Sequence, residues 1–139
     1  MEVIAQCARM VGVDTLHFGT AYGKMSGAKD EVLHIEDEME KSFTKKTKEN
    51  LSQKWYDVKR VFGVASGGVY PSLVPKIMEF MGKDVVIQAG GGIHGHTDGT
   101  VAGAKAMRQA VDATLKKIPL KKYAQTHEEL KEALKIWGE

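Results

Sequence analysis

Three short strand-like runs are each followed by a turn of glycine and small polar residues, and then by a stretch with helical spacing of apolar residues. The runs cover residues 14–17, 61–65 and 85–89. They lack the apolar–polar alternation that marks a strand with one solvated face. The pattern therefore predicts parallel strands buried on both faces and separated by helices, which is an α/β fold.

The spacing of apolar residues also predicts the helices around these strands. They cover Val3–Val11, which Gly12 ends, then Glu31–Phe43, Leu73–Met81, Val101–Leu115 and Glu128–Trp137. Residues 44–59 are mostly polar, with Trp55 and Tyr56 as apolar anchors, and we expect a solvated excursion or an irregular helix there.

Composition limits the class of partner. A chain of 139 residues is the size of one domain with a real core, and 20 Lys and Arg against 18 Asp and Glu give a net charge of +2. That balance favours a small molecule or another protein over nucleic acid or a membrane. Cys7 is the single cysteine, so no internal disulfide forms, and its helical pattern predicts a small core residue. With no leader pattern or membrane-length apolar run, we expect a soluble, cytoplasmic chain.

The strand-like runs end in HFGT, ASGG and QAGGG. In parallel α/β folds the ligand site lies at the carboxyl ends of the strands, because only the loops there converge on open space. Glycine exposes backbone N–H groups and permits the positive φ angles that aim them at one anion. The turns Ser66–Gly68 and Gly90–Gly92 therefore suggest a phosphate site, although tight turns alone also explain glycines.

The segment HFGTAYGKMSG ends a glycine-bounded turn in Gly-Lys but is not a P-loop. Three residues separate Gly19 from Gly23 where that motif has four, and Met25 replaces the hydroxyl residue that binds magnesium. Lys24 then fits either the lysine of a lid loop or a solvent-exposed lysine. His17 fits either a phosphate donor or a core histidine.

Two further histidines leave a metal alternative open. His94 and His96, followed by Asp98, put two imidazoles on one side of an extended segment. Because no third or fourth ligand is evident, this spacing is weak evidence for a metal.

The segments GVDTLHFGTAYGKMSG, VASGGVYPSLVPKI and VIQAGGGIHGHTDGTVAGAKAMRQAVDA resemble the last three βα units of the RuBisCO (ribulose-1,5-bisphosphate carboxylase) large subunit, most nearly its archaeal form III type. The resemblance runs from Met1 to at least Leu115. It implies a partial TIM barrel over residues 1–117, made of helix 5 and units 6 to 8, and a C-terminal helical extension over residues 118–139.

The resemblance also implies roles for single residues, with ribulose-1,5-bisphosphate and CO2 as substrates. His17 would bind one phosphate, and Lys24 on a mobile loop would stabilise the carboxylate formed from CO2. Ser66 would contact a substrate hydroxyl. The other phosphate would lie against backbone N–H groups of Gly68, Gly90 and Gly91. An archaeal enzyme of this type implies an AMP or nucleotide salvage route.

Some family positions differ here: Thr15 stands where a histidine is common, and Ser26 where an acidic residue is common. These positions bear on loop closure and on discrimination between CO2 and O2. Retention of Lys24 argues against the RuBisCO-like proteins that enolise other substrates.

The family's magnesium ion (Mg2+) is held by residues of an earlier strand, so the resemblance places no metal ligand in this chain. We expect the chain to need the N-terminal segment of a large subunit or to self-associate, and to be inactive alone. The alternatives are a phosphosugar isomerase or enolase-type relative, and a non-catalytic, self-associating barrel fragment.

Overall fold

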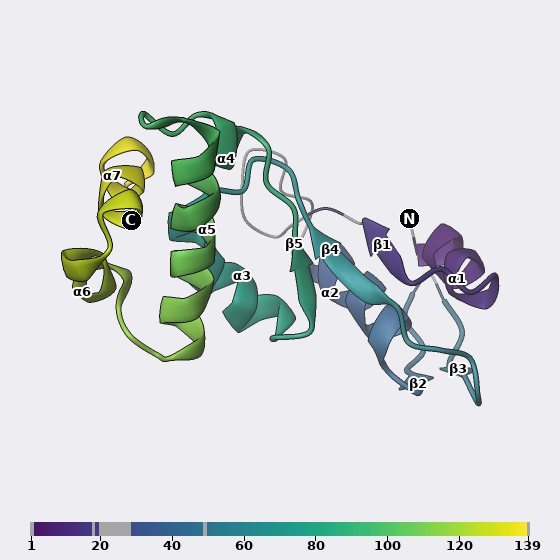
Figure 1. The fold of residues 1–139 in the computed structure, drawn as a ribbon. Coiled ribbons are helices and arrows are strands. Elements are labelled where there is room, and N and C mark those ends of the chain that lie inside the picture. Colours follow the sequence, from purple (N-terminus) through teal and green to yellow (C-terminus); the bar gives the residue numbers. More distant parts are fainter. Residues whose placement is uncertain (1, 18, 20–28, 49, 139) are drawn as a thin grey trace.

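A computed structural model describes residues 2–17, 19, 29–48 and 50–138 (Figure 1). Its centre is a sheet of three parallel strands in the order β1 (Thr15–His17), β4 (Phe62–Ala65) and β5 (Val85–Ile87). In register, His17 lies opposite Val64, and Val64 lies opposite Val86. The predicted α/β fold with parallel strands is confirmed.

Helix α1 (Glu2–Met10) precedes β1, and α2 (Lys29–Glu40) follows β1 in the chain; the two helices pack against each other. They are followed by a small antiparallel ribbon of β2 (Phe43–Thr44) and β3 (Gln53–Lys54). The predicted helix through Phe43 was therefore too long, because α2 ends at Glu40 and Phe43 pairs with Lys54. The described residues among 44–59 are mostly exposed and Trp55 is buried, so the solvated excursion with Trp55 as an anchor is confirmed. The irregular-helix alternative is wrong, because the described residues there form the ribbon, and Tyr56 is no anchor, since it is 77% exposed.

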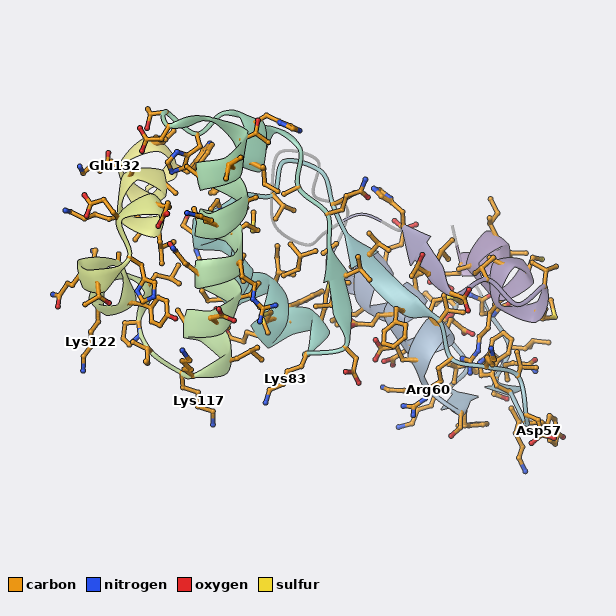
Figure 2. All side chains as sticks on the ribbon, viewed as in Figure 1. Asp57, Arg60, Lys83, Lys117, Lys122 and Glu132 are labelled. Atoms are coloured by element: carbon orange, nitrogen blue, oxygen red, sulfur yellow. The ribbon has the colours of Figure 1, made fainter. Side chains whose placement is uncertain are left out.

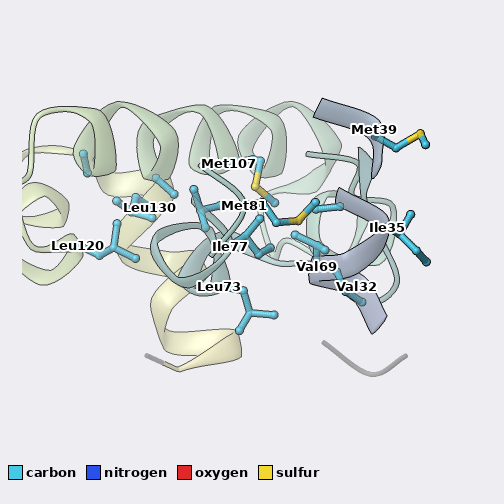
Figure 3. Close-up of a cluster of buried hydrophobic side chains, with 14 of the residues drawn as sticks. Val32, Ile35, Met39, Val69, Leu73, Ile77, Met81, Met107, Leu120 and Leu130 are labelled. Atoms are coloured by element: carbon cyan, nitrogen blue, oxygen red, sulfur yellow. The ribbon is translucent and has the colours of Figure 1, made fainter. Parts of the chain in front are cut away.

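The remaining helices lie toward the C-terminus. They are η1 (Pro71–Leu73), α3 (Val74–Met81), α4 (Gly91–His94), α5 (Gly99–Leu115), α6 (Leu120–Tyr123), η2 (Ala124–Thr126) and α7 (Glu128–Trp137). Figure 1 shows α5 between the sheet and α7. Ile77 and Met81 of α3 lie beside Met107 of α5 in the core close-up (Figure 3). Burying such side chains stabilises the fold by about 1.5–3 kcal/mol each.

One face of the sheet is uncovered in the part of the chain that the structure describes, except at Val64, which is 7% exposed. Phe62 is 51% exposed, Val86 is 41% exposed, and Thr15 and His17 are exposed as well. The expectation that the strands are buried on both faces is therefore wrong for this structure, because the described helices cover the other face alone.

Helix α1 turns its polar side inward. Glu2, Ala5 and Arg9 are buried, whereas Val3, Ile4 and Val11 are exposed. Cys7 is exposed too, so its prediction as a core residue was wrong. The reason is that Arg9 finds buried backbone acceptors on neighbouring segments, and this fixes which side of the helix faces inward.

Charged side chains extend from the outside of the fold. Figure 2 shows Lys83, Lys117 and Lys122 pointing outward along one edge of the molecule. None of the helices formed by the described residues is both long and apolar enough to cross a membrane.

Candidate functional site

The predicted site residues among the described part of the chain lie at the carboxyl ends of adjacent strands. His17 ends β1, Ser66 and Gly68 follow β4, and Gly90 and Gly91 follow β5. The pairing continues past the last strand residues, because the Gln88 N–H donates to the Ala65 carbonyl at 3.0 Å. The parallel register therefore brings all of these positions to one edge of the sheet.

His17 and Ser66 meet directly at this edge. The hydroxyl of Ser66 forms a hydrogen bond with Nε2 of His17, across 49 positions of sequence. Ser66 is 7% exposed, and His17 is exposed. The exposure of His17 contradicts the alternative of a core histidine, and it leaves the imidazole accessible to a ligand.

The turn after β4 depends on glycine. Gly67 has a φ of 106° and Gly68 a φ of 77°, which is backbone that residues with a Cβ rarely adopt. Gly68 is also exposed. The positive φ angles expected for an anion-binding turn are therefore present here.

The turn after β5 is built differently. Gly90 has a φ of −101°, so this glycine does not use the positive φ that its type permits, and the chain enters α4 at Gly91. A Cβ placed on Gly90 or on Gly91 would meet nothing within 4 Å. The backbone there is open, and the first N–H groups of a helix have no acceptor within it. Sequence reasoning missed α4, because three successive glycines are poor helix formers.

His94, His96 and Asp98 do not form a metal site. Nδ1 of His96 accepts a hydrogen bond from the Asp98 N–H at 3.1 Å, so Nε2 is the nitrogen that donates to the Glu129 carbonyl at 2.9 Å. His94 is bonded instead to the Thr100 hydroxyl at 3.1 Å. With both ring nitrogens of His96 engaged, the geometry disfavours the metal alternative. No cluster of three potential His, Cys, Asp or Glu ligands occurs among the described residues.

Lys24 and Ser26 lie outside the described residues. Thr15 lies at the start of β1 and is exposed on the uncovered face of the sheet.

The carboxyl groups with a raised pKa gather on α2 rather than at the strand ends. Burial raises the pKa of Glu36 to about 7, and the nearby Glu40 and Asp37 act in the same direction. Burial also raises the pKa of Glu38 and of Glu40. A pocket lined by Glu40, Arg60, Val61, Phe62 and Asp84 lies at the amino ends of the strands. These acidic groups are therefore at the end of the sheet opposite His17 and Ser66.

The family assignment follows from sequence comparison. Residues 1–137 match the model of the ribulose bisphosphate carboxylase large chain, catalytic domain. The chain belongs to this RuBisCO family. Ribulose bisphosphate carboxylase of Methanocaldococcus jannaschii is 50% identical over 139 residues, which cover 99% of this chain and 33% of that protein. The Pyrococcus furiosus carboxylase is 49% identical over 99% of this chain and 30% of its own length.

Solved RuBisCO structures agree with the fold. The dimeric archaeal RuBisCO of Hyperthermus butylicus matches with a TM-score of 0.86 and 42% identity, covering 97% of this chain and 32% of that chain. The octameric RuBisCO of Pyrococcus horikoshii matches with a TM-score of 0.87 and 44% identity, over 99% of this chain and 30% of that one. The chain thus spans about a third of the length of its RuBisCO relatives.

Proposed function

We propose that this chain forms the C-terminal part of a RuBisCO barrel and supplies part of the site that carboxylates ribulose-1,5-bisphosphate. Residues 1–117 would form helix 5 and the last three βα units, and residues 118–139 a C-terminal helical extension. The family assignment and the parallel β1-β4-β5 sheet support this proposal.

The observation that carries the proposal is the contact between His17 and Ser66. Two side chains distant in sequence reach each other at the carboxyl ends of neighbouring strands, where parallel folds bind ligands. In the structure each of these side chains is a hydrogen-bond partner of the other. A bisphosphate would separate them, with the imidazole donating to one phosphate and the Ser66 hydroxyl bonding to a substrate hydroxyl.

The glycine turns would take the second phosphate. Gly68, Gly90 and Gly91 are exposed, and their backbone N–H groups follow two adjacent strands. Hydrogen bonds from N–H groups to a charged oxygen contribute about 1.5–3 kcal/mol each, so a few of them fix one end of the substrate.

The role of Lys24 rests on the sequence motif. Its ammonium would lie against the carboxylate that develops as CO2 adds to the substrate, and neutralising that charge in a closed site lowers the barrier. The described residues include no group of three or more His, Cys, Asp or Glu side chains that could hold a magnesium ion. Its ligands would belong to the part of the barrel that the relatives have and this chain does not span.

The proposal is tested in a chimera in which residues 1–137 replace the matched third of the Methanocaldococcus jannaschii carboxylase. We expect the chimera to fix CO2 and a Lys24→Ala chimera to lose carboxylation while it still enolises ribulose bisphosphate. Lys83→Ala, in the turn between α3 and β5, is the matched control and should leave both reactions unchanged. A folded chimera that fixes no CO2 would overturn the proposal, and equal loss of both reactions in Lys24→Ala would remove the proposed role of that lysine.

An enolase-type or phosphosugar isomerase relative is the enzymatic alternative, and it predicts a folded chimera that enolises without carboxylating. A second candidate from another class is a self-associating fragment. The exposed Phe62 and Val86 on the uncovered sheet face favour association, because apolar patches of this kind lose unfavourable hydration when they are covered.

A further inference from the structure

Helix α7 packs against the segments that follow the two glycine turns. Its last residue, Trp137, stacks on Tyr70 with ring centroids 6.2 Å apart and an interplanar angle of 13°. The same indole approaches the loop after α4, since a Cβ placed on Gly95 would lie 3.3 Å from Cζ2 of Trp137. One side chain therefore touches the segment that follows the Ser66–Gly68 turn and the segment that follows the Gly90–Gly92 turn.

The second turn also touches the segment that follows the first turn, backbone against backbone. A Cβ on Gly92 would lie 2.1 Å from the Val69 carbonyl oxygen and 2.7 Å from Cα of Tyr70. Such distances leave no room for any side chain at Gly92. The second turn therefore approaches this segment closely at Gly92, and Trp137 packs on Tyr70 beside that contact.

The first turn of α7 is fixed as well. His96, which is 4% exposed, donates from Nε2 to the Glu129 carbonyl at 2.9 Å. Gln109 of α5 donates to the Glu129 carboxylate at 2.8 Å and accepts from the Leu130 N–H at 2.9 Å. Both ends of α7 are therefore attached, one to α5 and the loop after α4, the other to Tyr70.

We propose that α7 sets the spacing of the two glycine turns, and that Trp137 is the positioning residue that transmits it. The consequence for binding rests on the proposed function, in which N–H groups of both turns hold one phosphate. A displacement of about 1 Å between groups that must act together costs about 100-fold in function at well-organised sites. The helical extension is then part of the binding apparatus, although it contributes no group that touches the ligand.

The first arm of the test needs no ligand. Amide resonances of Gly67, Gly68 and Gly90–Gly92 are compared by NMR in the full wild-type chain and in Trp137→Ala, together with the nuclear Overhauser contact between Gly92 and Tyr70. We expect Trp137→Ala to shift both turns and to weaken that contact. Ile136→Ala, an apolar truncation at the neighbouring, 39% exposed position, should change neither. Unshifted turns in Trp137→Ala would overturn the proposal.

The second arm titrates inorganic phosphate into the same proteins. We expect Trp137→Ala to weaken phosphate binding by about 10-fold, Trp137→Phe to restore it to within about 3-fold, and Ile136→Ala to match the wild type. If Trp137→Ala does not fold, Trp137→Leu takes its place, since it keeps apolar volume and loses the ring stacking. Equal phosphate binding by Trp137→Leu and Trp137→Phe would then contradict the positioning role.

The two arms separate this inference from the function on which it draws. In one outcome, Trp137→Ala shifts the resonances of both turns, but phosphate changes no resonance of the wild-type chain. That outcome would contradict the proposed phosphate site and retain α7 as the element that spaces the turns. In the other outcome, the wild-type chain binds phosphate, but Trp137→Ala leaves the resonances of both turns unchanged. That outcome would retain the phosphate site and contradict the role of α7.

Discussion

The guanidinium of Arg9 lies 4.4 Å from the centroid of the Trp55 ring, and both residues are almost fully buried. Arg9 also donates to the carbonyl oxygens of Lys59, Glu38 and Lys41, at 3.0, 2.6 and 2.8 Å. Burial lowers the pKa of Arg9, although the nearby Glu38 opposes the shift. One side chain thus joins α1 to the end of α2 and to the segment that leads into β4.

Replacement of Arg9 should therefore destabilise the whole N-terminal half. We expect Arg9→Ala to lower the free energy of unfolding by about 3 kcal/mol, because one buried and two partly buried carbonyls lose their donor. Urea unfolding measures this. Arg108→Ala is the control, since Arg108 forms an exposed helical ion pair with Asp112 and should cost under about 0.5 kcal/mol. Similar losses of unfolding free energy in Arg9→Ala and Arg108→Ala would contradict the stabilising role of Arg9.

Glu36 should make stability depend on pH. Its pKa is raised from 4.5 to about 7 in the folded chain, so between these values the folded state binds more protons than the unfolded state. The free energy of unfolding should then fall as pH rises through this window, and the whole penalty should be present above it. Glu36→Gln removes the ionisation and should stabilise the chain by up to about 3 kcal/mol at pH 8, with little effect at pH 4.

Urea unfolding at a series of pH values measures the Glu36 effect. The control is Glu79→Gln, at an exposed position of α3, which should keep the slope of the wild type. An unchanged slope in Glu36→Gln would show that another group is responsible.

Alanine substitutions at the neighbouring glycines Gly91 and Gly92 should affect different properties: Gly92→Ala should lower stability, and Gly91→Ala should weaken phosphate binding. Gly92→Ala forces a Cβ against the Val69 carbonyl oxygen and should cost about 1–3 kcal/mol of stability. Gly91→Ala meets nothing within 4 Å and should change stability by less than about 0.5 kcal/mol. Its methyl group would nevertheless enter the space proposed for phosphate, so we expect about 10-fold weaker binding. Thermal unfolding and phosphate titration measure the two effects, and a Gly91→Ala protein that binds phosphate normally would argue against the site.

The uncovered sheet face should drive association of the isolated chain. Light scattering should give a solution mass above that of a monomer, and Phe62→Lys with Val86→Lys should return it toward the monomer. Val101→Lys, at a 73% exposed position of α5 away from this face, should leave the mass unchanged. A wild-type monomer at high concentration would rule out association through this face.

Much of the architecture was predictable because its signals are local. The spacing of Leu130, Ala133, Leu134 and Trp137 gave the observed bounds of α7, and the glycine turns marked the ends of β4 and β5. The end of α2 was less predictable, because Phe43 continues the helical spacing yet pairs with Lys54 in the ribbon. The burial of α1 was not predictable either, since it depends on acceptors for Arg9 that lie 29 to 50 positions away.

The candidate site was predictable in position more than in detail. Strand ends and glycines indicated the edge of the sheet at which His17 and Ser66 meet and where Gly68 follows β4. No local pattern indicates that His96 uses both ring nitrogens within the fold, because Glu129 comes to it through the packing of α7. The place of Lys24 stays a prediction.

The connections between the strands have a consequence for assembly. β4 and β5 are joined by η1 and α3, whereas β1 and β4 are separated by α2 and the ribbon, which is a much longer stretch of chain. Closing a longer loop costs more entropy, so the β4–β5 pairing should form first and β1 should join afterwards. The strand that a ribosome makes first would then be the last of the three to find its partner.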